Sequence, residues 1–347
     1  MRFIRFLSIS AFALLLSAPV SAAASEFLLI DVRGDVRFKP EGQSHYQSAR
    51  EGNFLTLGDR LRTAAGGQVR ILCDDSATTW VMYSNQESGV AEGCPPSLFG
   101  TRLRIGNQDD NASGGNNPDI PYVVSPRRTA VLDSQPLLSW NPVSGAVSYT
   151  VQVVGSEITW ETQTTDTEVR YTGESLIAGA EYQVIIEADN GPSSQLDEGS
   201  ETATFELIYP EDWEIVQTAI ANISEQNISA EIQALALANL YIREDLFAEA
   251  IDTLEPFAAA ETNTFGVYQK LGVICRYIGL NLLAEERYQQ AINIALAEGA
   301  IEGLADARSG LAEVKLMLDQ KESAIELLTR ARDGYKVLEN TERADEL

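Results

Sequence analysis

The chain has 347 residues, of which 51 are acidic and 25 are basic, so its formal net charge at pH 7 is −26. This length corresponds to two or three domains. A surface this acidic repels a phosphate backbone, so we expect no nucleic-acid partner. One His and three Cys leave few side chains for Ser-His-Asp catalysis or for a zinc site. The sequence therefore predicts neither a cofactor nor a bound metal, while its 44% hydrophobic content allows packed cores.

Residues 1–24 have the three parts of an export signal. Arg2 and Arg5 form a basic start, Phe6 to Leu16 are apolar, and small residues after Pro19 offer a cleavage site. We expect cleavage there and a periplasmic or secreted protein; the alternative is an uncleaved N-terminal anchor. No later segment has the run of about 18 apolar residues that a transmembrane helix needs.

The three cysteines fall into two groups. Cys73 and Cys94 lie about twenty positions apart in a region of predicted strands. In an exported protein such a pair favours a disulfide, which stabilises the fold by about 3 kcal/mol. The alternative is a redox pair, but the C-x-x-C spacing typical of such sites is missing. Cys275 lies on an apolar helix face and is expected to be a buried thiol.

Residues 26–105 are predicted to form a small all-β domain, because short alternating runs such as Leu28, Ile30 and Val32 are separated by glycine turns. Basic and acidic residues are nearly balanced in this region. The acidity of the chain therefore belongs to the later regions, and this domain is able to present a neutral or basic face.

One segment of this domain has a recognisable pattern. The stretch from Arg50 to Thr63 reads Arg-Glu-Gly-Asn-Phe-Leu-Thr-Leu-Gly-Asp-Arg-Leu-Arg-Thr, and an apolar strand, Gly67 to Leu72, and an Asp75-Ser76 turn follow it. These features resemble the core of the FecR-type periplasmic domain. The resemblance implies a small β module outside the cytoplasm. It does not imply sigma-factor signalling, because the cytoplasmic segment and membrane helix of that system are missing.

Residues 106–119 are predicted to form a flexible linker, because they are rich in Asn, Asp, Gly and Ser. The alternative is a calcium-binding loop, since Asp109, Asn111 and Ser113 have the opening spacing of an EF-hand loop. Ile120 stands where that loop needs a bidentate carboxylate, so the linker is favoured.

Residues 120–208 are predicted to form a second β domain. Trp140 lies on an alternating strand, a Gly-Ala turn leads to Tyr149, and Leu176 precedes Tyr182 by six residues. This pattern resembles a fibronectin type III domain. The resemblance implies a β-sandwich in which Trp140 is a core residue and the Tyr182 hydroxyl is hydrogen bonded to backbone.

From Pro210 onward the apolar period becomes helical, and Pro favours the first turn of a helix. Leu237-Ala238 recurs as Leu271-Gly272 after 34 residues and as Leu311-Ala312 after a further 40. This recurrence resembles the tetratricopeptide (TPR) repeat. We therefore expect residues 210–347 to form an α-solenoid of about three repeats plus a capping helix.

In such an array the first helix of each repeat lines a concave groove, where Arg and Tyr are effective anchors for a bound peptide. The alternative is that each of these residues occupies an ordinary solvated position. The residues that we place in the groove are Asn239, Arg243, Gln269, Arg276, Tyr277, Glu313 and Met317.

The sequence as a whole predicts a multidomain β plus α fold and a non-enzymatic exported adaptor that binds a protein or peptide in this groove. The alternative is an envelope protein that binds polysaccharide or peptidoglycan on the β domains, for which the candidate exposed aromatic residues are Trp80, Tyr83 and Trp160.

A third alternative, a hydrolase, would need carboxylates that converge on a substrate. The pairs Asp74-Asp75 and Glu285-Glu286 are adjacent in sequence, so their side chains diverge on a strand or a helix.

Overall fold

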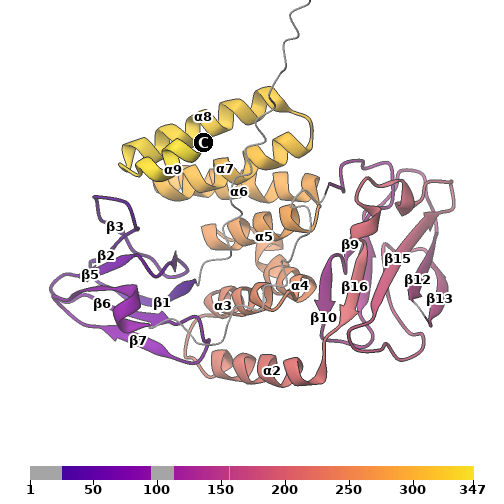
Figure 1. Ribbon diagram of the computed structural model, residues 1–347, viewed down its shortest axis with the longest axis horizontal. Coiled ribbons are helices and arrows are strands. Elements are labelled where there is room, and N and C mark those ends of the chain that lie inside the picture. Colours follow the sequence, from indigo (N-terminus) through magenta and orange to yellow (C-terminus); the bar gives the residue numbers. More distant parts are fainter. Residues whose placement is uncertain (1–25, 95–112, 156) are drawn as a thin grey trace, which may run out of the picture.

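The structure is a computed structural model that describes residues 26–94, 113–155 and 157–347. It has two groups of β-sheets followed by a run of helices, so the chain is a β plus α multidomain protein. The helices stand between the two β parts (Figure 1). The predicted signal peptide and residues 106–112 of the predicted linker lie outside the described residues.

The N-terminal β module, residues 26–94, consists of two antiparallel sheets with strand orders β4-β1-β6-β7 and β3-β2-β5-β8. Its elements are β1 (Phe27–Arg33), β2 (Val36–Lys39), β3 (Gln47–Ser48), β4 (Phe54–Leu55), β5 (Arg60–Thr63), β6 (Gln68–Leu72), β7 (Thr79–Met82), β8 (Glu87–Gly89) and the short helix α1 (Val90–Gly93).

Strand β1 is buried on both faces. Phe27 and Leu29 pack in the core of the N-terminal β module, whereas Leu28 and Ile30 pack in the same hydrophobic cluster as the helices. Successive side chains of a strand point to opposite faces, so four consecutive apolar residues require a covering layer on each side. The helices supply the second layer, which fixes the module against them.

The cysteines occupy two kinds of site. Cys73 and Cys94 form a disulfide, with their Cα atoms 5.5 Å apart, that ties the end of β6 to the end of α1. Cys275 is a buried free thiol, and burial raises its pKa to about 12.

The second β module, residues 120–208, has a five-stranded sheet, β10-β16-β15-β12-β13, that packs with a three-stranded one, β14-β11-β9. Trp140 is a buried core residue of this module, and the Tyr182 hydroxyl accepts a hydrogen bond of 2.8 Å from the backbone N–H of Ile177. Both features are those that the fibronectin resemblance implies. The strands are β9 (Val123–Ser125), β10 (Thr129–Val131), β11 (Leu137–Trp140), β12 (Tyr149–Gly155), β13 (Thr159–Thr164), β14 (Glu168–Arg170), β15 (Glu181–Ala188) and β16 (Thr204–Leu207).

The helical array, residues 210–347, is a run of helices in which α3 to α9 each pack on the next one along the chain. The helices are α2 (Pro210–Ser224), α3 (Ala230–Arg243), α4 (Phe247–Ala259), α5 (Phe265–Tyr277), α6 (Asn281–Glu298), α7 (Ile301–Met317), α8 (Lys321–Val337) and α9 (Thr341–Glu346). Over the part of the chain that the structure describes, no helix is long and apolar enough to cross a membrane.

Small residues allow close packing between these helices. A Cβ at Gly272 of α5 would lie 2.9 Å from the ring of Tyr288 on α6, and one at Gly310 of α7 would lie 2.5 Å from the same ring. The Tyr288 ring is therefore held between two neighbouring helices, and it is fully buried. Gly272 and Gly310 therefore leave the space that the large Tyr288 ring occupies between the helices.

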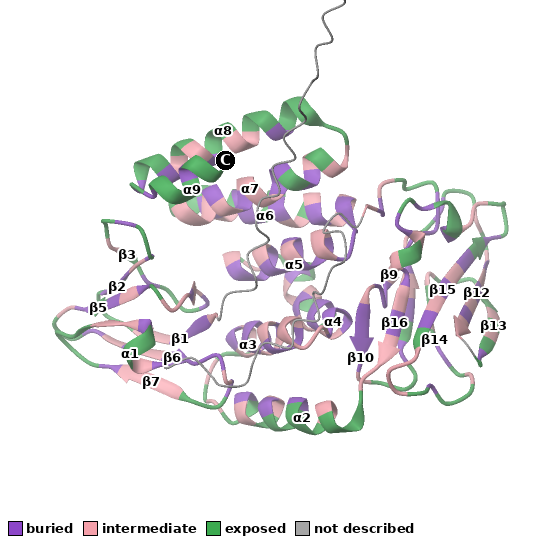
Figure 2. Cartoon of the chain, viewed as in Figure 1, coloured by how far each residue is buried: buried purple, intermediate pink, exposed green. Residues whose placement is uncertain are grey.

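A single hydrophobic cluster joins all three parts of the molecule. It contains Leu28, Ile30 and Leu72 of the N-terminal β module, Tyr122 and Ala130 of the second β module, and the inner faces of helices α2 to α7. Figure 2 shows buried residues on β1 of the N-terminal β module, on helices α3 and α5, and on β10 of the second β module.

Candidate functional site

Helix α3 is in contact with the N-terminal β module. Arg243 donates a hydrogen bond to the backbone oxygen of Asp74, and Asn239 accepts one of 3.1 Å from the Lys270 ammonium group of α5. Lys270 also pairs with Glu26 and lies 4.0 Å from the centre of the Phe54 ring. Two of the predicted groove residues are therefore engaged within the chain itself.

Two glycines permit this close approach. Gly52 has a φ of +83°, and a Cβ there would lie 3.3 Å from a methyl group of Leu235 on α3. A Cβ at Gly266, in the first turn of α5, would lie 3.2 Å from the backbone oxygen of Gly52. The loop between β3 and β4 is thereby seated directly on α3 and α5. Gly52 belongs to the stretch from Arg50 to Thr63. The sequence pattern predicts a turn at Gly52 but not its contact with the helices.

The second β module holds another predicted groove residue. The Tyr277 ring lies 4.9 Å from the ring of Phe247, and the guanidinium of Arg128 lies 4.4 Å from the centre of the Tyr277 ring. Arg128 also donates to the backbone oxygen of Tyr277 at 3.0 Å. Tyr277 therefore lies in the interface between α5 and the second β module.

Arg127 is the buried centre of this interface. Its side chain forms an ion pair of 3.0 Å with Asp197, and both side chains are almost completely buried. It also donates to the backbone oxygens of Ile278 at 2.9 Å and Gly199 at 2.8 Å. Burial lowers the pKa of Arg127, while Asp197 opposes that effect. The bond to Ile278 joins the second β module to the end of α5, whereas Asp197 and Gly199 hold the Arg127 side chain from within the module.

The segment before the second β module is also engaged. The backbone oxygen of Gly114 accepts a hydrogen bond of 3.2 Å from the N–H of Asn281, and Asn116 accepts one of 3.0 Å from the Asn281 side chain. Gly115 donates to Asp197 at 2.9 Å. The described end of the predicted linker, residues 113–119, is thus hydrogen bonded both to α6 and to the second β module.

Two half-buried glutamates lie where a β module contacts the array. Glu249 of α4 accepts a hydrogen bond of 2.7 Å from the N–H of Leu132, and burial raises its pKa to about 7. Glu302 of α7 accepts bonds from Gln43 at 2.7 Å and Gln47 at 3.0 Å. Burial is the main reason that its pKa is raised to about 8, with nearby carboxylates adding to the effect.

The other predicted groove residues lie on α5 and α7. Arg276 and Glu313 form an ion pair of 2.7 Å, with side chains 28% and 47% exposed. Met317, in the last turn of α7, is half-buried. Gln269 is half-buried too, and its Oε1 atom is buried without a hydrogen-bond partner among the described residues. Of the predicted groove residues, Arg276, Glu313 and Met317 are therefore partly exposed to solvent.

The aromatic residues of the polysaccharide alternative occupy different environments. Trp80 is half-buried, and its ring packs directly on Gly93, where any side chain would overlap it. Trp160 is half-buried and lies 5.1 Å from the ring of Tyr171 in an edge-to-face contact. Tyr83 is 60% exposed. The two tryptophans are thus packed against their own modules, and Tyr83 alone of these three is strongly exposed.

The adjacent carboxylates do not converge. Asp75 accepts hydrogen bonds from the backbone N–H groups of Ala77 and Thr78, as a turn residue does. Glu285 pairs with Lys315, and Glu286 pairs with Arg287. Among the described residues, no group of three or more His, Cys, Asp or Glu side chains is placed to hold a metal ion.

Comparisons with known proteins give partial similarities. No family model matches the chain, and no curated protein matches it. The crystal structure of MamA protein is 22% identical and has a TM-score of 0.30, with 36% of this chain and 67% of that chain covered.

Two further solved structures match with lower TM-scores. BtubC from P. vanneervenii is 23% identical with a TM-score of 0.28, covering 39% of this chain and 53% of that chain. The FN1–FN3 domains of chicken CNTN1 are 15% identical with a TM-score of 0.19, covering 50% and 53% of the two chains. The present chain thus spans about half the length of these two structures.

Proposed function

We propose that the protein is a non-enzymatic exported scaffold, in which the helical array holds two β modules and binds a protein partner on the part of its concave face around Arg276. The observation that carries this proposal is the hydrophobic cluster that all three parts share. A joint core of this kind keeps the modules at fixed positions, as a scaffold requires. The disulfide supports export, because such bonds persist in oxidising compartments.

The partner surface follows from exposure and chemistry. The Arg276–Glu313 ion pair is partly exposed, and Leu316, next to Met317 at the end of α7, is 49% exposed. On the following helix Ile325 is 64% exposed. Arg and Met are enriched in the centres of protein interfaces, and exposed apolar side chains add contact area. The N-terminal β module already contacts Arg243 of α3 and Lys270 of α5, so the proposed surface lies farther along the array.

The experiment uses the mature chain as bait in an extract of the cell envelope, followed by an affinity measurement with each purified, captured protein. The test variant is Arg276→Ala with Met317→Ala. The matched control is Arg170→Ala with Leu196→Ala, which removes an exposed ion-paired Arg and an exposed apolar residue from the second β module.

We expect at least one captured protein whose affinity falls about tenfold or more in the test variant and is unchanged in the control. If the test variant keeps its affinity for every captured protein, or if the control loses as much affinity, the proposed location of the partner surface is wrong. Absence of any captured protein would contradict the scaffold proposal.

A further inference from the structure

Four cations share one solvent face of the N-terminal β module. In the antiparallel pair of β2 and β5, Arg37 lies opposite Arg62 and Lys39 lies opposite Arg60. Opposed residues in such a pair project to the same face, and so do residues two apart on one strand. The intervening residues Val36, Phe38, Leu61 and Thr63 are buried on the other face.

This arrangement is unfavourable for the module by itself. Like charges that lie directly opposite each other destabilise a sheet, and here two such pairs are adjacent. Among the described residues, the carboxylates that pair with this face are Asp35, 3.0 Å from Arg37, and Glu87, 3.5 Å from Arg60 and opposite Arg62 in the pair of β5 and β8. Four cations and two carboxylates leave positive charge in excess among these described residues, although the whole chain has a net charge of −26.

Tyr46 lies over the same face. The guanidinium of Arg62 is 4.2 Å from the centre of its ring, and the Lys39 ammonium is 5.9 Å from it. The Tyr46 hydroxyl donates a hydrogen bond of 2.9 Å to Glu87. These contacts hold an aromatic ring among the four cations and orient their side chains.

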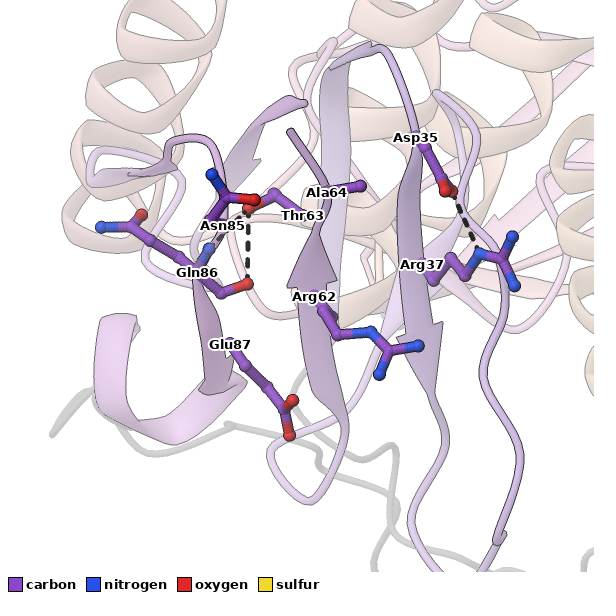
Figure 3. A pocket seen from close by; sticks show the side chains of 8 residues that line it. All are labelled: Asp35, Arg37, Arg62, Thr63, Ala64, Asn85, Gln86 and Glu87. Atoms are coloured by element: carbon purple, nitrogen blue, oxygen red, sulfur yellow. Dashed lines mark hydrogen bonds and ion pairs between the residues drawn. The ribbon is translucent and has the colours of Figure 1, made fainter. Parts of the chain in front are cut away.

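A pocket of about 550 Å³ opens at the end of this face. Arg62 lies between Arg37 and Asp35 on one side and Gln86 and Glu87 on the other (Figure 3), and all five line the pocket. Guanidinium groups bind carboxylates or phosphates through paired hydrogen bonds. Asp35 and Glu87, when ionised, only accept hydrogen bonds, so the matching ligand has to donate hydrogen bonds as well as bear negative charge.

We propose that this face, defined by Arg37, Lys39, Arg60, Arg62 and Tyr46, binds an acidic polysaccharide whose sugars have carboxylate and hydroxyl groups. The carboxylates of the sugars pair with the guanidinium groups, and their hydroxyls donate hydrogen bonds to Asp35 and Glu87. The four cations are arranged along two strands, so a linear polymer is able to contact all of them. The site is independent of the protein-binding surface around Arg276.

Other polyanions fit the observations less well. A nucleic acid or an anionic membrane presents a broad negative surface, which the strongly acidic remainder of the chain repels. A single polysaccharide chain is narrow enough to contact the basic face alone. An acidic peptide has few hydroxyl donors, and its usual anchors are apolar or aromatic, whereas this pocket is lined almost entirely by polar side chains.

The test measures binding of a fluorescent oligogalacturonate to the full mature chain at low salt. Two further probes separate the contributions: its methyl ester keeps the hydroxyls without charge, and oligoglutamate keeps the charge without sugar hydroxyls. The variant is Arg37→Ala with Arg62→Ala, and the control is Lys321→Ala with Arg330→Ala, two exposed cations of α8.

We expect oligogalacturonate to bind about tenfold or more tightly than either other probe, and the Arg37→Ala, Arg62→Ala variant to lose about tenfold in affinity. The control should stay within about twofold, and so should Arg276→Ala with Met317→Ala, which separates this site from the array surface. Equal binding of oligoglutamate, equal binding of the methyl ester, or no binding of oligogalacturonate would overturn the proposal.

Discussion

The backbone oxygen of Gly52 and the Cα of Gly266 face each other so closely that a Cβ on Gly266 would lie 3.2 Å from that oxygen. This contact places the loop before β4 against the first turn of α5. It makes this part of α3 and α5 an internal interface, and the proposed partner surface around Arg276 lies outside that contact.

Gly52→Val should disrupt this contact. Both Gly52, at φ +83°, and Gly66, at φ +78°, have left-handed backbone conformations, but the space around Gly66 is open. Gly66→Val therefore measures the strain alone, whereas Gly52→Val adds overlap with Leu235. We expect Gly52→Val to lower the free energy of unfolding by about 1 kcal/mol more than Gly66→Val, measured by urea denaturation. Equal effects of the two variants would mean that the loop is not seated on α3.

Arg127→Leu should be strongly destabilising, because it leaves the carboxylate of Asp197 buried without its cation. The expected loss is about 3–5 kcal/mol. Arg170→Leu removes an exposed ion pair with Asp133, and its effect should stay within about 1 kcal/mol. Chemical denaturation checks both variants, and a loss below that of Arg170→Leu would contradict the buried role of Arg127.

The raised pKa of Glu302 predicts a definite pH dependence. Its pKa is about 8 in the folded chain, and its ordinary value is 4.5. The folded state therefore keeps a proton that the unfolded state loses, so this stabilising contribution is complete below about pH 4.5 and is lost as the pH rises through 8. Glu302→Gln removes the titration, so the variant should gain stability relative to the wild type between pH 5 and pH 8.

Thermal unfolding across this pH range tests that prediction, and the relative gain should be about 1 kcal/mol or more. Glu326→Gln is the control, because that side chain is 62% exposed. The environment of Glu302 also includes Asp306, Asp59 and Arg343. A Glu302→Gln curve parallel to the wild type would show that the carboxyl group titrates normally.

The three cysteines should differ in reactivity. Mass spectrometry of the exported protein without reductant should show Cys73 and Cys94 bridged, and native Cys275 should resist alkylation because it is buried with a raised pKa. Replacing Cys73 and Cys94 together with Ala should lower the free energy of unfolding by about 3 kcal/mol. Rapid labelling of Cys275 in the native protein would contradict its buried position.

Local patterns in the sequence predict much of this fold. Trp140 and Tyr182 identify a sandwich core and corner because their neighbours alternate with the strand period. Pro210 begins α2, as its position before a helical pattern indicates. Each of these predictions depends on residues that are close in sequence, where periodicity and turn chemistry are informative.

The packing between the parts could not be predicted in the same way. The groove positions Asn239 and Arg243 have the chemistry of partner-binding residues, and nothing in their own helix shows that Asp74 and Lys270 occupy them. One signal was present in the sequence. Four consecutive apolar residues, Phe27 to Ile30, imply a strand covered on both faces, but they do not identify the helices that cover the second face.

The most direct test of the internal interface is zero-length carbodiimide cross-linking of the mature protein, followed by peptide mass spectrometry. Lys270 and Glu26 are in contact across the interface, so we expect an amide between them. Lys315 and Glu285 form a comparable pair within the array and serve as the positive control. A Lys315–Glu285 cross-link without one between Lys270 and Glu26 would contradict the docking of the N-terminal β module on α3 and α5.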